Sequence, residues 1–92
     1  MPNPSPNKEL IYSKALSLLS RREHSAHELF LKLKKRFHED EILIKEILQE
    51  LEAKKYLVNQ RYAEMITRHR ATLGYGPNYI KQELKSHHVG ID

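Results

Sequence analysis

Apolar residues recur along this chain at spacings of three, four and seven, and this period constrains the fold more than any other feature. Such spacing places the residues on one face of an α-helix, whereas a half-buried strand needs alternation at every second residue. No stretch of more than a few residues alternates in that way. The sequence therefore predicts an all-α fold of five amphipathic helices.

The expected helices are separated by short connecting segments. The first runs from residue 8 to about 20, the next three begin after residues 25, 40 and 59, and the fifth runs from residue 77 to about 87. The residues that we expect to face inward are Ile11, Ala15, Leu18 and Leu19; Leu29, Phe30, Leu33 and Phe37; Ile44, Ile47, Leu48 and Leu51; Tyr62, Ala63, Ile66 and Leu73; and Ile80 and Leu84.

Local signals mark where these helices begin and end. Ser25 and Glu28 match a capping box, in which the serine oxygen accepts from the amide of residue 28 and the glutamate reaches back to the amide of Ser25. Gly74 suits the left-handed conformation that ends a helix, and Pro77 suits the first turn of the next one. We therefore expect structural roles for Ser25, Glu28, Gly74, Gly76 and Pro77, and capping roles for Asn7 and Asn59.

A weak internal repeat divides the chain. Ala15, Leu18 and Arg22 match Ala63, Ile66 and Arg70 at an offset of 48, and Leu29 and Leu33 match Ile80 and Leu84 at an offset of 51. Chance similarity between two amphipathic helices is the alternative. The repeat predicts a first three-helix unit over residues 8–57 and an incomplete second unit, with two helices, over residues 58–92. Three prolines at the start predict a disordered lead over residues 1–7.

Composition limits the classes of function. The chain has no cysteine, which excludes disulfides and thiolate metal sites and fits a reducing compartment. The first residues lack the pattern of a signal peptide, and no apolar run approaches the roughly 20 residues that span a bilayer. These features predict a cytoplasmic protein without a membrane partner. The formal net charge of +4 admits an anionic partner without requiring one.

No grouping of residues points to catalysis, to a cofactor or to a metal. The six histidines lack the helical i, i+4 spacing of a metal pair with a third ligand nearby. Gly74 and Gly76 follow no predicted strand and lack a third glycine, so neither phosphate-binding loop is matched. Nothing pairs a nucleophile with a base and an orienting acid. We therefore expect a protein that is not an enzyme and that binds no cofactor or metal.

Several motifs resemble the RecX family in order and spacing. They are Arg22-Glu-His-Ser-Ala-His-Glu-Leu29 with Lys32-Leu33, Tyr56-Leu57, Arg61-Tyr-Ala63 and Arg68-x-Arg-x-x-x-Gly-Tyr-Gly-Pro-x-x-Ile-x-x-Glu-Leu84, and the match covers roughly residues 12–89. The resemblance implies a curved protein of tandem three-helix repeats that lies along the groove of a RecA–DNA filament. It also implies inhibition of the RecA ATPase and of strand exchange, in DNA repair, recombination and the SOS response.

The chain departs from the family pattern in three respects. The family carries a further helix in its second repeat and then a third repeat, so the resemblance implies that this chain is shortened within the second repeat. Phe37 and His88 stand where the family usually has glycine, and both would be strained in a left-handed conformation. Val58-Asn59 replaces an acidic pair, which predicts a neutral cap for the fourth helix.

Basic side chains are the expected contacts with RecA or with DNA phosphates, because a guanidinium can bind a phosphate or a carboxylate through two hydrogen bonds. Arg61 and Arg68 are seven residues apart and lie near one helical face, whereas Arg70 points elsewhere. The complete set is Arg61, Arg68, Arg70, Lys32, Lys35, Arg36 and Lys81. The expected partners are the RecA filament and, in a supporting role, the backbone of single-stranded DNA, with the protein acting as a monomer.

Two alternative roles for these basic residues stay open. They could simply form solvated helix faces, or pair with acids such as Glu64. The chain could also be an independent DNA-binding module of helix-turn-helix type that reads DNA with its fifth helix. That helix offers Lys81 and Lys85 but few side chains suited to base edges beyond Asn78 and Gln82, which argues against sequence-specific reading.

Overall fold

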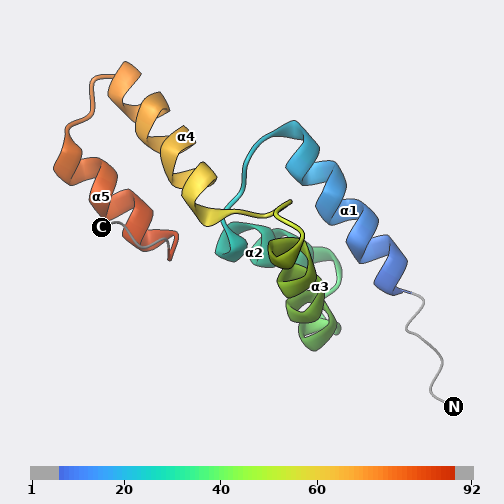
Figure 1. The fold of residues 1–92 in the computed structure, drawn as a ribbon. Coiled ribbons are helices and arrows are strands. Elements are labelled where there is room, and N and C mark those ends of the chain that lie inside the picture. Colours follow the sequence, from blue (N-terminus) through green and yellow to red (C-terminus); the bar gives the residue numbers. More distant parts are fainter. Residues whose placement is uncertain (1–6, 89–92) are drawn as a thin grey trace, which may run out of the picture.

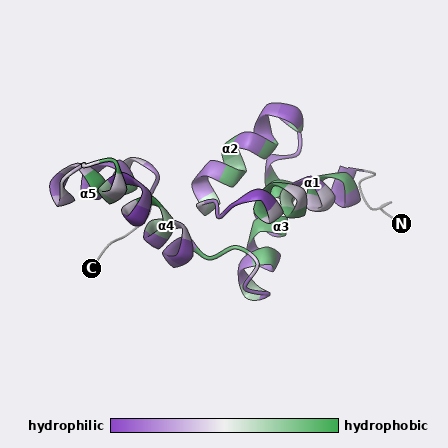
Figure 2. Cartoon of the chain, turned by 90° about the horizontal axis from the view of Figure 1, so that it is seen from above, coloured by the Kyte–Doolittle hydropathy of each residue, from purple (hydrophilic) through white to green (hydrophobic). Residues whose placement is uncertain are grey.

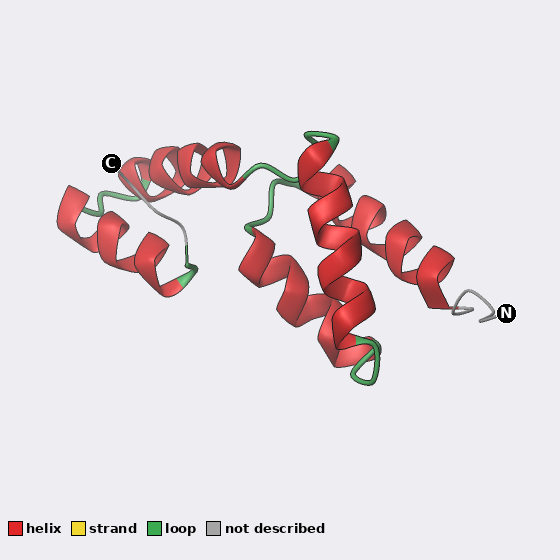
Figure 3. Cartoon of the chain, turned by 60° about the horizontal axis from the view of Figure 1, so that its bottom comes forward, coloured by secondary structure: helices red, strands yellow, loops and turns green. Residues whose placement is uncertain are grey.

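The computed structural model describes residues 7–88, and this part of the chain contains helices and no strand (Figure 3). Its helices are α1 (Asn7–Arg21), α2 (Ala26–Arg36), α3 (Glu41–Ala53), α4 (Asn59–Thr72) and α5 (Pro77–Ser86). One unit consists of α1, α2 and α3, and a second unit consists of α4 and α5 (Figure 1). The molecule measures 54 × 22 × 20 Å, so the units lie end to end. The predicted all-α class is confirmed.

The predicted boundaries agree with the observed helices within a few residues. α1 begins at Asn7, which we expected as its cap, and the Asn7 side-chain amide donates to the Asp40 carboxylate at 2.8 Å. The rest of the expected disordered lead lies outside the described residues, as do the last four residues of the expected second unit. No helix in residues 7–88 combines the length and the apolar character needed to cross a membrane.

The first unit has a core to which all three of its helices contribute. Leu29 and Leu33 of α2 share this core with Ile44 and Ile47 of α3, and every one of these side chains is buried. Figure 2 shows hydrophobic green where α1 and α3 come together. The buried members of this core are Ile11, Ala15, Leu18, Leu29, Leu33, Phe37, Ile44, Ile47, Leu48, Leu51 and Leu57. All the inward positions predicted for α1, α2 and α3 are buried, except Leu19 and Phe30, which are partly buried against the core.

The second unit has a separate and smaller core. Tyr62 and Ile66 of α4 pack against Ile80 and Leu84 of α5, with Ala63 and Met65 partly buried beside them. Leu73 is 59% exposed, and its predicted inward position is therefore wrong. It follows the last residue of α4 and lies at the turn, where no helix of the described chain covers it.

The turn between α4 and α5 forms as the sequence predicts. Gly74 adopts φ = 92° in the left-handed region, where a side chain would be strained, and its amide donates to the Ala71 carbonyl at 3.0 Å. Gly76 is the N-cap of α5, and Pro77 occupies the first turn. Of the two helix ends expected to be strained, Phe37 stays at φ = −117°, whereas His88 is left-handed at φ = 59°.

Two predicted caps are corrected by the structure. Ser25 Oγ accepts from the Glu28 amide at 3.0 Å, but the Glu28 carboxylate binds Arg22 instead of reaching back to the Ser25 amide. Asn59 does not cap α4, because Val58 is the N-cap and provides no side-chain hydrogen bond. Asn59 Oδ1 instead accepts from the amide of Ala26 at 2.8 Å. The asparagine of the second unit therefore satisfies a free amide at the start of α2.

Candidate functional site

The two units meet at a polar joint, defined by the contacts Asn59–Ala26, Arg61–Glu23 and His27–His88. Among the residues that the structure describes, no buried residue belongs to both cores. Besides the Asn59 hydrogen bond, an ion pair joins Arg61 to Glu23, and the rings of His27 and His88 stack with centroids 3.9 Å apart. These contacts come from positions separated by more than 30 residues in the chain. The relative placement of the units therefore depends on polar contacts and ring stacking.

Arg61, a predicted partner contact, takes part in this joint. Its Nε lies 2.9 Å and 3.2 Å from the two carboxylate oxygens of Glu23. A terminal nitrogen donates to the carbonyl oxygens of Lys55 at 2.9 Å and Tyr56 at 3.3 Å. The side chain therefore ties α4 to the loop after α1 and to the end of the first unit, and its ion-pair partner is Glu23, not Glu64.

Arg70 is also engaged inside the molecule. It binds the Glu83 carboxylate through two hydrogen bonds of 2.7 Å, in a partly buried bidentate pair that links α4 to α5. The hydrogen bonds from Arg70 lower the pKa of Glu83, because they favour the charged carboxylate. The pair thus stabilises the second unit, and Glu83 neutralises the charge of Arg70.

The other predicted contact residues differ in whether their side chains have partners inside the molecule. Lys32 Nζ lies 2.9 Å from His24 Nε2 and 3.7 Å from Glu28, and the Arg36 guanidinium lies 5.3 Å from the centre of the Phe37 ring. Within residues 7–88, no ion pair or side-chain hydrogen bond holds the exposed basic residues Lys35, Arg68 and Lys81. Their charges are therefore available to an outside partner.

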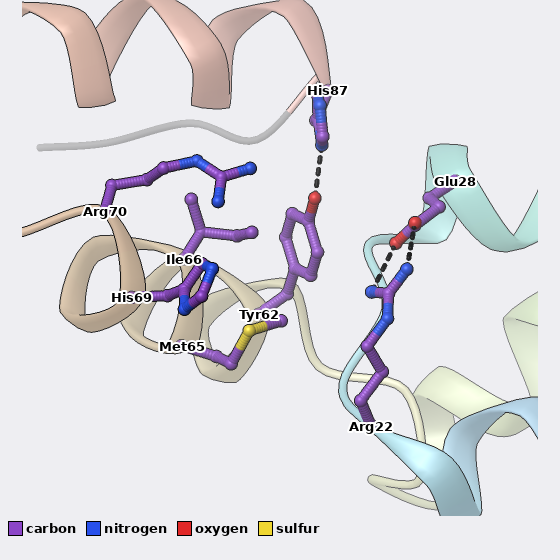
Figure 4. Close-up of a pocket in the computed structure, with 8 residues that line it drawn as sticks. All are labelled: Arg22, Glu28, Tyr62, Met65, Ile66, His69, Arg70 and His87. Carbon is purple, nitrogen blue, oxygen red and sulfur yellow. Dashed lines mark hydrogen bonds and ion pairs between the residues drawn. The ribbon is translucent and has the colours of Figure 1, made fainter. Parts of the chain in front are cut away.

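A pocket of about 350 Å³ lies next to the joint (Figure 4). On one side the Arg22 guanidinium binds the Glu28 carboxylate at 2.6 Å and 3.1 Å, and on the other the Tyr62 hydroxyl is hydrogen-bonded to His87 Nδ1. The lining residues are Arg22, Glu28, Tyr62, Met65, Ile66, His69, Arg70 and His87. The pocket is thus bordered by side chains of both units.

The ionisation of the pocket follows from burial and pairing. Burial raises the pKa of Tyr62 to about 12, so the phenol stays protonated at neutral pH and is a poor nucleophile. Burial alone would raise the pKa of Glu28, but the hydrogen bond and the charge of Arg22 outweigh it and lower that pKa. In the folded chain both groups are engaged in hydrogen bonds, Tyr62 with His87 and Glu28 with Arg22. In the described part of the chain, no three potential ligand side chains lie close enough to hold a metal ion.

His24 is a structural residue that the sequence did not reveal. It is buried beside the joint, and its Nδ1 lies 3.0 Å from the Arg22 carbonyl oxygen while Nε2 faces Lys32. Burial lowers the pKa of His24 and favours the neutral ring. A neutral ring can donate from Nδ1 to the carbonyl and accept from the lysine at Nε2. His24 lies in the loop before Ser25, where no helical periodicity marks a buried position. The sequence also did not reveal the roles of Glu23 and Asn59, because their partners, Arg61 and Ala26, lie more than 30 residues away in the chain.

Comparison with known proteins places both units in one family. The model described as "RecX, first three-helix domain" matches residues 12–43, and the model described as "RecX, second three-helix domain" matches residues 59–90. The first match begins within α1 and ends within α3, and the second contains α4 and α5. The tandem order agrees with the division into two units.

Curated relatives named "Regulatory protein RecX" support this result. The protein from Mannheimia succiniciproducens is 44% identical over 77 residues, which cover 83% of this chain and 49% of the relative. The protein from Stenotrophomonas maltophilia strain K279a is 40% identical over 87 residues, which cover 95% of this chain and 52% of the relative. The chain spans about half the length of these relatives, and no solved structure matches it. With both domain models matched in order, the chain belongs to the RecX family of regulatory proteins.

Proposed function

We propose that this chain regulates the RecA recombinase by binding the RecA–DNA filament, lowering its ATPase activity and inhibiting strand exchange during DNA repair and recombination. The observation that carries the proposal is the tandem match of two RecX domains to two helical units placed end to end. The relatives are named regulatory proteins, and we infer that this chain likewise acts by binding rather than as an enzyme. We infer a monomer that works in the cytoplasm, where it meets RecA.

The proposed contact surface uses the basic side chains that the fold leaves available. Arg68, Lys35 and Lys81 are exposed and unpaired in residues 7–88, so they can bind a phosphate or a carboxylate without first losing an internal partner. Lys32 and Arg36 extend the basic surface of α2. Arg61 and Arg70 stay in the proposed set, but a partner would have to compete with Glu23 and Glu83 for them.

A titration of RecA ATPase on single-stranded DNA tests the proposal. The chain should lower the ATPase rate in proportion to the filament that it occupies. Arg68→Glu should weaken this inhibition and flatten its salt dependence, because a lost phosphate contact removes one counterion-release contribution. Arg21→Glu is the matched control, since it makes the same charge change at an exposed position of α1. Circular dichroism of each variant checks that the helices persist.

Two results would count against the proposal. If the chain leaves RecA activity unchanged at concentrations well above that of the filament, the regulatory role fails. If it ignores RecA but binds duplex DNA sequence-specifically, the helix-turn-helix alternative replaces it. Equal loss of inhibition in Arg68→Glu and Arg21→Glu would assign the effect to overall charge and reject Arg68 as a contact.

A further inference from the structure

Two tyrosines form an exposed stack at the turn between α4 and α5. The rings of Tyr75 and Tyr79 lie with centroids 4.3 Å apart and planes inclined by 14°. The residues are 44% and 50% exposed, and Leu73 beside them in the chain is 59% exposed. Neither tyrosine belongs to the core of the second unit, which consists of other side chains of α4 and α5. The stack therefore presents aromatic surface that the fold does not use.

The backbone around the stack is well fixed. The Tyr75 amide donates to the Arg70 carbonyl at 3.0 Å, directly after the left-handed Gly74. Tyr79 lies in the first turn of α5, after Pro77, and the Ile80 amide donates to the Gly76 carbonyl at 3.2 Å. This arrangement lowers the entropy that the two rings would lose on binding a ligand, because their backbone positions are already set.

The surrounding charge favours an anionic partner. Residues 65–88 contain four lysines and arginines and one acid, Glu83. That acid is held by Arg70 in the bidentate pair, whereas Arg68 and Lys81 have no ion pair in the described chain. The stack thus belongs to a segment with an excess of positive charge, and the turn that carries it lies at the end of the molecule remote from the first unit (Figure 1).

We propose that the Tyr75–Tyr79 stack binds an unpaired nucleobase of single-stranded DNA, which continues the stack while basic side chains of the same segment attract the phosphates. Aromatic faces stack on any base, and basic grooves with exposed aromatic rings are how proteins bind single strands without reading their sequence. Duplex DNA buries its base faces between neighbouring pairs, so it offers the stack no equivalent ligand. The inference goes beyond the proposed function, because it assigns a contact with the bases, made by two tyrosines that the proposed contact set does not include.

Binding of oligothymidylate of about twelve nucleotides tests the proposal, within the range of site sizes known for single-strand binding. An abasic oligomer with the same number of phosphates separates stacking from charge. Because the chain has no tryptophan, the fluorescence of its tyrosines can be followed, and the quenching that disappears when Tyr75 and Tyr79 are both replaced belongs to the stack; the anisotropy of a labelled oligomer reports binding. The experiment contains no RecA, so its outcome and that of the ATPase titration are independent.

The variants distinguish the contribution of the aromatic rings to binding from that of the hydroxyl groups and from that of apolar side-chain volume. The double variant Tyr75→Leu, Tyr79→Leu should bind oligothymidylate about tenfold more weakly than the parent, whereas Tyr75→Phe, Tyr79→Phe should bind like the parent. Tyr56→Leu is the matched control, because Tyr56 is 51% exposed but lies beside the joint. Binding of the abasic oligomer should be weaker and should not change with any of these substitutions.

Several outcomes would overturn the proposal. Equal binding of the base-bearing and abasic oligomers would show that only phosphates are bound. An undiminished affinity in the leucine variant would exclude the stack, and an equal loss in the phenylalanine variant would assign the binding to the hydroxyl groups. If the leucine variant fails to fold, the phenylalanine variant and the two oligomers still decide the question.

Discussion

Ile42 and Ile47 lie on the same helix, α3, and differ chiefly in their surroundings. Ile47 is 1% exposed within the first core, whereas Ile42 is 75% exposed. Ile47→Ala should lower the free energy of unfolding by about 2–5 kcal/mol, the usual cost of deleting a buried isoleucine side chain. Ile42→Ala should change it by less than about 0.5 kcal/mol. Urea unfolding followed by circular dichroism measures both changes. Equal unfolding midpoints for the two variants would show that Ile47 is not part of the core.

Leu33 provides the same test on a second helix of that core. Its side chain is fully buried on α2, and Leu33→Ala should again cost about 2–5 kcal/mol. Leu31, on the same helix but 47% exposed, is its matched control. Stabilities of small domains are of order 5–15 kcal/mol, so the loss at Leu33 could remove much of the folded population. A midpoint shift within error at Leu33 would contradict the burial.

Individual core residues could be predicted because burial follows the helical period. Leu29, Leu33 and Ile47 lie on the apolar faces of their helices, and these faces pack into the core, so the spacing alone identifies them. Leu73 shows the limit of this reasoning, since its spacing from Ile66 fits the inward face but α4 has ended before it. Periodicity gives the face of a helix, and it does not tell how far a neighbouring helix covers that face.

At the scale of helices, α4 and α5 are held together by the Arg70–Glu83 pair as well as by their core. The folded state lowers the pKa of Glu83 below its ordinary 4.5. The unfolded chain therefore binds the proton more tightly, and the stabilising contribution of the pair is present above about pH 4.5 and lost as the pH falls through the lower folded value. Glu83→Gln should consequently be less stable than the parent at neutral pH, with the difference shrinking in acid.

Thermal unfolding at about pH 7 and about pH 3 measures this change. The control Glu64→Gln removes an exposed carboxylate of α4 that has no ion pair in the described chain. Its difference from the parent should stay small at both pH values. A Glu83→Gln variant that matches the parent at neutral pH, or whose deficit grows in acid, would contradict a stabilising charged pair.

Helix ends could be predicted only where the signal is local. Gly74 and Pro77 determine their turn through their own backbone restrictions, so the sequence identifies them directly. Glu28 could satisfy a capping box, but Arg22 offers its carboxylate a charged partner with two hydrogen bonds. Asn59 has the right residue type for a cap and serves α2 instead of α4. Residue type indicates which side chains can cap a helix, and the tertiary fold determines which helix end each of them binds.

The same limit applies to the candidate contacts. Arg61 and Arg68 have equivalent positions in a helical projection, yet Arg61 binds Glu23 and Arg68 has no partner in residues 7–88. Glu23 lies 38 residues before Arg61, so no local pattern connects them. The sequence could therefore identify a basic set, but it could not separate the side chains that hold the units together from those left for a partner.

At the scale of the whole molecule, two cores of unequal size are connected by the polar joint. Over residues 7–88, eleven buried residues form the first core and four form the second, so the first unit buries far more apolar surface. The joint consists of the Asn59 hydrogen bond, the exposed Arg61–Glu23 pair and the histidine stack, and exposed ion pairs contribute little. Coupling between the units is therefore weak, and each should open largely on its own.

Hydrogen exchange should consequently protect the amides of α1, α2 and α3 more strongly than those of α4 and α5, because local opening costs less where fewer apolar contacts break. Ile66→Ala, in the second core, should lower protection in α4 and α5 and leave the first three helices nearly unchanged. Ile47→Ala is the reciprocal variant and should act mainly on the first unit. Uniform protection in the parent, or an equal loss in both units from either substitution, would mean that the polar joint couples them into one cooperative structure.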